Sequence, residues 1–140
     1  MLPEIDVLVV EDHAILRDQL VTGLAKRGWT VRAAANGRVA LKTMETCKPK
    51  VLVTDIFMPD IEGLELIRLT RHICADIKII AMSGGSSVCG NFLPEACRFG
   101  ANAALMKPFT RADLAELVAT MLSESSEPSP SSKADQHPSL

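Results

Sequence analysis

Four short apolar runs, each ended by a polar residue, constrain what this chain can fold into. The runs are Val7–Val10 before Glu11 and Asp12, Val51–Thr54 before Asp55, Ile79–Met82 before Ser83, and Ala103–Met106 before Lys107. Near-continuous apolar runs of this length are typical of parallel strands that are covered on both faces. Because open α/β sheets bind ligands beyond the carboxyl ends of their strands, the sequence predicts three carboxylates, a hydroxyl and an ammonium at one edge of one sheet.

Helical patterns alternate with these runs. Leucines recur every four residues after the first run until Gly28, and Thr30–Ala34 then predicts another strand. Asn36 and Gly37 mark the turn into a second helix, and Pro49 is expected to end the connection before the next strand. The first half of the chain therefore predicts strand and helix in strict alternation.

The second half continues the alternation. A third helix is predicted after Gly63, and Thr110 predicts the N-cap of the last helix, with Asp113 three residues later. The segment 86–94 is irregular, so we expect a helix there either to start late or to be partly mobile. Together these patterns predict an α/β protein, a flavodoxin-like doubly wound (βα)5 domain whose five-stranded parallel sheet has the order 2-1-3-4-5.

Composition limits the domain count and the class of function. The chain of 140 residues becomes rich in Ser and Pro at 123–140, which predicts a folded domain at 1–122 followed by a disordered tail. A net charge of −2 without any basic cluster argues against nucleic-acid binding. We see no signal peptide, and no apolar stretch approaches the roughly 20 residues of a membrane span. The expected location is the cytoplasm.

The four cysteines do not have the spacing of a metal site. They are Cys47, Cys74, Cys89 and Cys97. We interpret them as reduced thiols, and the sequence leaves a regulatory disulfide open.

The acidic residues at the strand ends predict a cation site. Two carboxylates about 4 Å apart repel by roughly 4 kcal/mol at an effective dielectric near 20. Oxygen ligands suit Mg²⁺, so Glu11, Asp12 and Asp55 are candidate metal ligands. A carboxylate beside Mg²⁺ can attack phosphorus, and Asp55, which stands alone at its strand end, is the candidate nucleophile. Lys107 would add positive charge, and Ser83 a hydrogen bond to the product.

At this point the chain resembles the CheY-like receiver domains of two-component response regulators. The resemblance spans about residues 5 to 121. It rests on four motifs of coherent spacing, which are Val9–His13, Asp55–Pro59 with Gly63–Glu65 behind it, Ser83–Gly84, and Gly100–Asn102 with Leu105–Phe109.

The resemblance implies a phosphorylation switch rather than an enzyme. Asp55 would accept phosphate from a histidine kinase or phosphotransfer protein in a phosphorelay. The backbone carbonyl of Phe57 would be a further Mg²⁺ ligand, Ser83 and Lys107 would contact the phosphoryl group, and the Lys107–Pro108 bond would be cis. An effector protein would bind the face built from the fourth helix, the last strand and the last helix. We expect a single-domain regulator that is a monomer or a weak dimer.

Two positions depart from the family pattern. The family usually has Tyr or Phe three residues before the lysine, where this chain has Ala104. Phe57 is large and apolar, which suggests that it crowds the hydrolytic water and slows autodephosphorylation.

Two other functions stay open. Ala104 is compatible with a receiver-like module that binds proteins without phosphorylation. A phosphatase with an aspartyl nucleophile would need a second acid two residues after Asp55, and Phe57 occupies that position.

Overall fold

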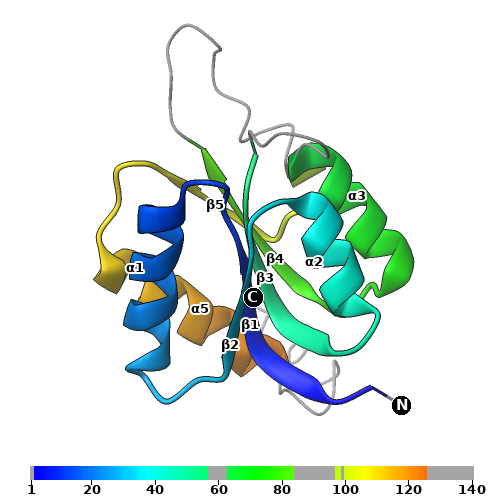
Figure 1. Cartoon of the computed structure of the whole chain (residues 1–140), viewed down its shortest axis with the longest axis horizontal. Helices are drawn as coiled ribbons and strands as arrows, with labels where there is room; N and C mark the ends of the chain where they lie inside the picture. The colour runs from blue at the N-terminus through cyan, green and yellow to red at the C-terminus, as the bar shows by residue number, and fades with distance from the viewer. Residues whose placement is uncertain (1, 57–62, 84–96, 99, 126–140) are drawn as a thin grey trace, which may run out of the picture.

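The computed structural model describes residues 2–56, 63–83, 97–98 and 100–125. Strands and helices alternate in the described residues up to Ser83 (Figure 1). In order they are β1 (Glu4–Val10), α1 (Ala14–Ala25), β2 (Val31–Ala34), α2 (Gly37–Met44), β3 (Lys48–Asp55), α3 (Gly63–Ile73), β4 (Lys78–Ser83), β5 (Ala103–Met106) and α5 (Arg111–Ser125).

The strands form one parallel sheet of order β2-β1-β3-β4-β5, which confirms the predicted fold. Helices α1 and α5 cover one face of the sheet, and α2 and α3 cover the other (Figure 1). Alternate residues of each strand enter the two cores: Val7 and Val9 pack toward α1 and α5, whereas Leu8 and Val10 pack toward α2 and α3. This double covering explains why the runs are apolar at nearly every position.

Three helices begin where their sequences place an N-cap. The side chain of His13 accepts from the Leu16 amide, and Asn36 Oδ1 accepts from the Val39 amide at 2.9 Å. At α5, Thr110 Oγ1 accepts from the Asp113 amide at 2.9 Å, and Asp113 Oδ2 accepts from the Thr110 amide at 3.2 Å. These bonds satisfy amide groups that the first helical turn leaves free.

The prediction for Pro49 was wrong, because β3 begins at Lys48 and includes the proline. The Lys48 amide donates to the Pro3 carbonyl on the β1 side at 2.8 Å. Successive amides along a strand point to opposite sides, so the missing amide of Pro49 would face β4. Pairing between β3 and β4 starts only at Val51, and the sheet therefore loses no hydrogen bond at Pro49.

The last helix continues to Ser125, past the predicted domain boundary at residue 122. The Glu124 carboxylate lies 3.5 Å from Lys78 Nζ at the start of β4, which holds this end of α5 against the sheet. The rest of the predicted tail, 126–140, lies outside the described residues, as does the irregular segment 86–94. Among the helices that the structure describes, none is long and apolar enough to cross a membrane.

Candidate functional site

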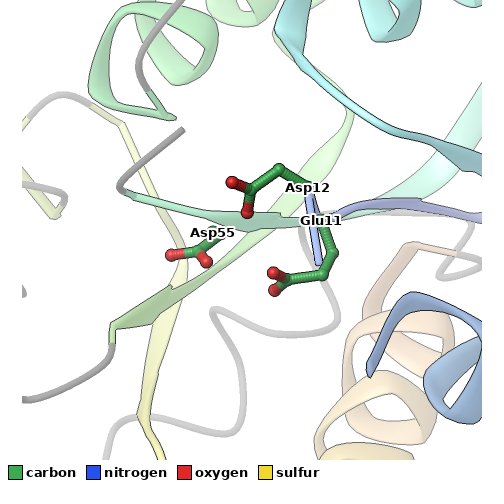
Figure 2. A group of neighbouring side chains, drawn as sticks. All are labelled: Glu11, Asp12 and Asp55. Carbon is green, nitrogen blue, oxygen red and sulfur yellow. The ribbon is translucent and has the colours of Figure 1, made fainter. Parts of the chain in front are cut away.

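Three carboxylates meet at the carboxyl edge of the sheet. Glu11 and Asp12 directly follow β1, and Asp55 is the last residue of β3 (Figure 2). The pairing of Val10 with Thr54 brings the ends of these two central strands level. One oxygen from each carboxylate lies within 4.8 Å of the others. The predicted acidic cluster is therefore present.

The three carboxylates differ in burial. Glu11 is 1% exposed and Asp55 is 6% exposed, whereas Asp12 lies on the surface. Burial and the nearby charge of Asp55 raise the pKa of Glu11, and the hydrogen bond from Lys107 opposes this rise. The site thus concentrates negative charge where water is scarce.

Lys107 bridges the two buried carboxylates. Its Nζ lies 3.0 Å from Glu11 Oε1 and 3.0 Å from Asp55 Oδ2. Burial disfavours the ammonium, but hydrogen bonds and charge from Asp55 and Glu11 outweigh it and raise the pKa of Lys107. One ammonium faces two carboxylates, with Asp12 close by, so a net negative charge remains. The Lys107–Pro108 bond is cis, as the resemblance implied.

Ser83 lies at the same edge, at the end of β4. It is fully buried, and its backbone carbonyl accepts from the Lys107 amide at 2.7 Å. This bond fixes the end of β5, and with it the start of the lysine side chain, beside the end of β4. Asp55 pairs with Met82, which places Ser83 one residue beyond the level of Asp55.

Two contacts that hold Glu11 are not evident from the sequence. The His13 amide donates to Glu11 Oε2 at 3.2 Å, and Arg17 Nη1 donates to the Glu11 backbone carbonyl at 2.9 Å. His13 is also the N-cap of α1, and it is not in the group of carboxylates. Arg17 lies six residues after Glu11, in the first turns of α1, and this short separation is the signal that could have suggested its bond to the Glu11 carbonyl.

Gly63 allows α3 to begin directly against the end of β3. Its amide donates to the Ile56 carbonyl at 2.8 Å, and a Cβ at this position would lie 2.0 Å from the Asp55 carbonyl oxygen. No other residue type fits this approach without displacing the backbone beside Asp55. Phe57, for which we predicted a ligand carbonyl and an effect on hydrolysis, lies outside the described residues.

The donor set suits a hard divalent cation. Its ligand atoms are carboxylate oxygens from Glu11, Asp12 and Asp55, with no thiol or imidazole in the group. Mg²⁺ prefers such oxygens and retains waters that a phosphate can replace. The residual negative charge around Lys107 also favours a cation.

The sequence profile of the response regulator receiver domain matches residues 7–119. The chain belongs to this receiver family. All the residues that form the site lie inside the matched region. Receiver domains of this family are phosphoacceptor switches of two-component systems.

Relatives of this receiver domain occur alone and within larger proteins. It is 34% identical to the response regulator receiver protein CpdR of Brucella abortus over 83% of this chain and 95% of that protein. It is 40% identical to the sensor kinase CckA of the same organism, but spans only 12% of that kinase. It also spans about half of two transcriptional regulatory proteins and of the response regulator MprA. A CheY-like receiver domain from Methanospirillum hungatei superposes with a TM-score of 0.76 at 29% identity, over 89% of this chain and 97% of that one.

The receiver domain carries Ala104 on β5, where it pairs with Ala81 of β4 and is half-buried. The family's usual aromatic ring is absent at this position. Met106, on the same strand and the same side of the sheet, is 46% exposed. At these two positions the last strand therefore presents a small and a flexible side chain.

Proposed function

We propose that this receiver accepts a phosphoryl group on Asp55 in a Mg²⁺-dependent phosphorelay and signals through a partner protein. The observation that carries the proposal is the position of Lys107 Nζ, 3.0 Å from Asp55 Oδ2 in a group of three carboxylates. A purely structural ion pair would not need two further carboxylates beside it. The donor would be a histidine kinase or a phosphotransfer protein.

The transfer requires little from the protein beyond positioning and charge. An Asp55 carboxylate oxygen attacks phosphorus, a P–O bond forms, and the P–N bond to the donor histidine breaks as the imidazole leaves and regains a proton. Lys107 would bind a phosphoryl oxygen on Asp55, and Ser83 would donate a hydrogen bond to another. Glu11, Asp12 and Asp55 would hold Mg²⁺, which would neutralise charge on the phosphoryl oxygens.

The ends of β4 and β5 adjoin the site and could carry its signal to the surface. Ser83 and Lys107 join the ends of β4 and β5, so a phosphoryl group bound to both would draw these strand ends together. We propose that an effector protein reads this change on the face that β5 and α5 contribute to. The match to CpdR over nearly its full length supports action as a single-domain regulator.

We propose a reducing compartment for this receiver. Cys47, Cys74 and Cys97 are free thiols in the structure. Disulfides are rare in the cytoplasm, where we propose that this receiver meets its phosphodonor.

The test is phosphorylation of the full chain by acetyl phosphate with and without Mg²⁺, followed by intact-mass analysis. We expect one added phosphoryl group in the presence of Mg²⁺ and none after chelation. Asp55→Asn should remove it, whereas Asp18→Asn, which changes an exposed carboxylate on α1, should not. Modification that persists in Asp55→Asn would refute the assignment.

A second candidate is a binding module that works without phosphorylation, which Ala104 favours. The two functions differ in what Asp55→Asn does to partner capture. Loss of the capture that acetyl phosphate induces supports the switch, whereas capture that is the same for both proteins under all conditions supports the module.

A further inference from the structure

Asp12 is held in the acidic group differently from the other two carboxylates. All three carboxylates point toward one region (Figure 2). Glu11 and Asp55 are buried, and Lys107 contacts both of them. Asp12 is exposed and takes no part in this bridge. The direction of its side chain therefore depends on the backbone on either side of it.

The peptide group before Asp12 is held by Arg17 of α1. The Nη1 of Arg17 donates to the backbone carbonyl of Glu11 at 2.9 Å, and this bond is partly buried. That carbonyl belongs to the planar peptide group that joins Glu11 to Asp12. A bond to its oxygen limits the rotation of this plane, and so it restricts the direction in which the Asp12 side chain leaves the backbone.

The peptide group after Asp12 is held by the neighbouring acid. The His13 amide donates to Glu11 Oε2 at 3.2 Å, while Glu11 Oε1 lies 3.0 Å from Lys107 Nζ. The Glu11 amide donates to the Ala34 carbonyl at 3.1 Å. The amide, the carbonyl and both carboxylate oxygens of Glu11 are thus all bonded. Asp12 lies between two peptide groups whose hydrogen bonds both involve Glu11.

The backbone of Arg17 is itself fixed by the start of α1. Its amide donates to the His13 carbonyl at 2.9 Å, and the His13 side chain accepts from the Leu16 amide in the same turn. Hydrogen bonds therefore close the short segment from Glu11 to Arg17 on itself, with Asp12 inside it. A side chain that starts from a fixed helical turn can hold the Glu11 carbonyl in one place.

The charge of Arg17 opposes cation binding. Arginine side chains are positively charged at neutral pH, so this one would repel a divalent cation held by the nearby carboxylates. Coulomb's law alone predicts that a neutral residue at this position would strengthen cation binding. Arg17 can favour the cation only through the hydrogen bond that it makes. The sign of its effect on Mg²⁺ affinity thus separates a positioning role from a purely electrostatic one.

We propose that Arg17 is a positioning residue of the Mg²⁺ site, which orients the Asp12 carboxylate through its bond to the Glu11 carbonyl. Groups that orient metal ligands typically contribute about tenfold or more to metal affinity. The inference rests on the Mg²⁺ site of the proposed function and extends that site to a residue of α1. Arg17 contacts neither Asp55 nor Lys107 in this arrangement, so its effect is on the cation alone.

The test is a titration of the full chain with MgCl₂, followed through the NMR signals of the backbone amides. Arg17→Met removes the donor and the charge but keeps an unbranched side chain on the helix. We expect its dissociation constant for Mg²⁺ to rise about tenfold. Arg38→Met, which removes the same charge from an exposed position of α2, is the matched control and should change this constant by less than about twofold.

Two further measurements separate the hydrogen bond from the fold. Arg17→Lys keeps a charged donor, and a single hydrogen bond needs only one donor, so its dissociation constant should stay within about threefold of the wild-type value. In EDTA, the His13 amide should exchange with solvent faster in Arg17→Met than in the wild type, because release of one flanking peptide loosens the other. Melting curves in EDTA would establish that both variants are folded.

The outcomes distinguish this inference from the proposed function. A wild-type chain that does not bind Mg²⁺ would overturn both. If the wild type binds Mg²⁺ and Arg17→Met binds it equally well or more tightly, the positioning role alone is overturned. A loss in Arg17→Lys as large as that in Arg17→Met, or His13 exchange that Arg17→Met leaves unchanged, would also overturn the positioning role.

Discussion

Glu11 is a candidate metal ligand, but its buried charge destabilises the fold when no cation is bound. Its carboxylate is almost fully buried beside that of Asp55, and one ammonium from Lys107 serves both. A buried charge is costly when it is incompletely paired. In the absence of a cation, Glu11 therefore weakens the fold, and its raised pKa reports the same conflict.

Replacing this carboxylate by an amide should stabilise the metal-free protein. We expect Glu11→Gln to raise the free energy of unfolding in EDTA by about 1 kcal/mol, because the repulsion with Asp55 is lost while the Lys107–Asp55 pair stays. The same variant should gain less stability from added Mg²⁺. Urea unfolding with and without Mg²⁺ measures both effects.

The control is Glu116→Gln on the exposed face of α5, which should change neither value. A Glu11→Gln protein that is less stable than the wild type in EDTA would contradict the argument.

Among the elements, α3 connects the two ends of the molecule. Its first residue, Gly63, contacts the backbone of Asp55. Near its other end, Arg71 donates to the Gly100 and Ile77 carbonyls and to Asn102 Oδ1, which also accepts from the Ile79 amide at 2.8 Å. Arg71 therefore fixes the start of β5 to the loop before β4.

Loss of this arginine should cost more than loss of a neighbour on the same helix. We expect Arg71→Ala to lower the free energy of unfolding by about 2–4 kcal/mol, since several backbone carbonyls lose a charged donor. Arg68→Ala should change it by less than about 0.5 kcal/mol, because the pair of Arg68 with Glu65 is exposed. Chemical denaturation measures the free energy of unfolding of both variants. Equal losses would show that Arg71 does not hold the start of β5 to the loop before β4.

The contrast between α3 and the strands shows what the sequence could predict. Strands and caps depend on near neighbours in the chain, so the apolar runs and Thr110 were sufficient to predict them. The carboxylates converged because parallel strands share one carboxyl edge. The Arg71–Gly100 bond joins positions 29 residues apart, and no local pattern records it. The end of α5 was missed for the same reason, because Glu124 is held by distant Lys78.

At the scale of the whole molecule, the sheet separates two chemistries. Its carboxyl edge gathers charge around Lys107, and its amino edge surrounds an apolar cavity that contains Cys74. Each group is brought together by strands that are distant in sequence. The unfolded chain therefore lacks the carboxylate site, and any cation that binds there must stabilise the fold.

Magnesium should thus raise the melting temperature of this protein, and Asp12 offers the sharpest test. At a free Mg²⁺ concentration tenfold above the dissociation constant, the gain is about 1.4 kcal/mol, which corresponds to about 5 °C for a domain of this size. Asp12 is exposed, so Asp12→Asn should leave the metal-free melting temperature nearly unchanged and remove most of the Mg²⁺-dependent rise. Asp18→Asn should keep the full rise. A metal site at the carboxyl edge needs the Asp12 carboxylate, whereas the metal-free fold does not. If Asp12→Asn kept the Mg²⁺-dependent rise in melting temperature, the cation would therefore bind elsewhere.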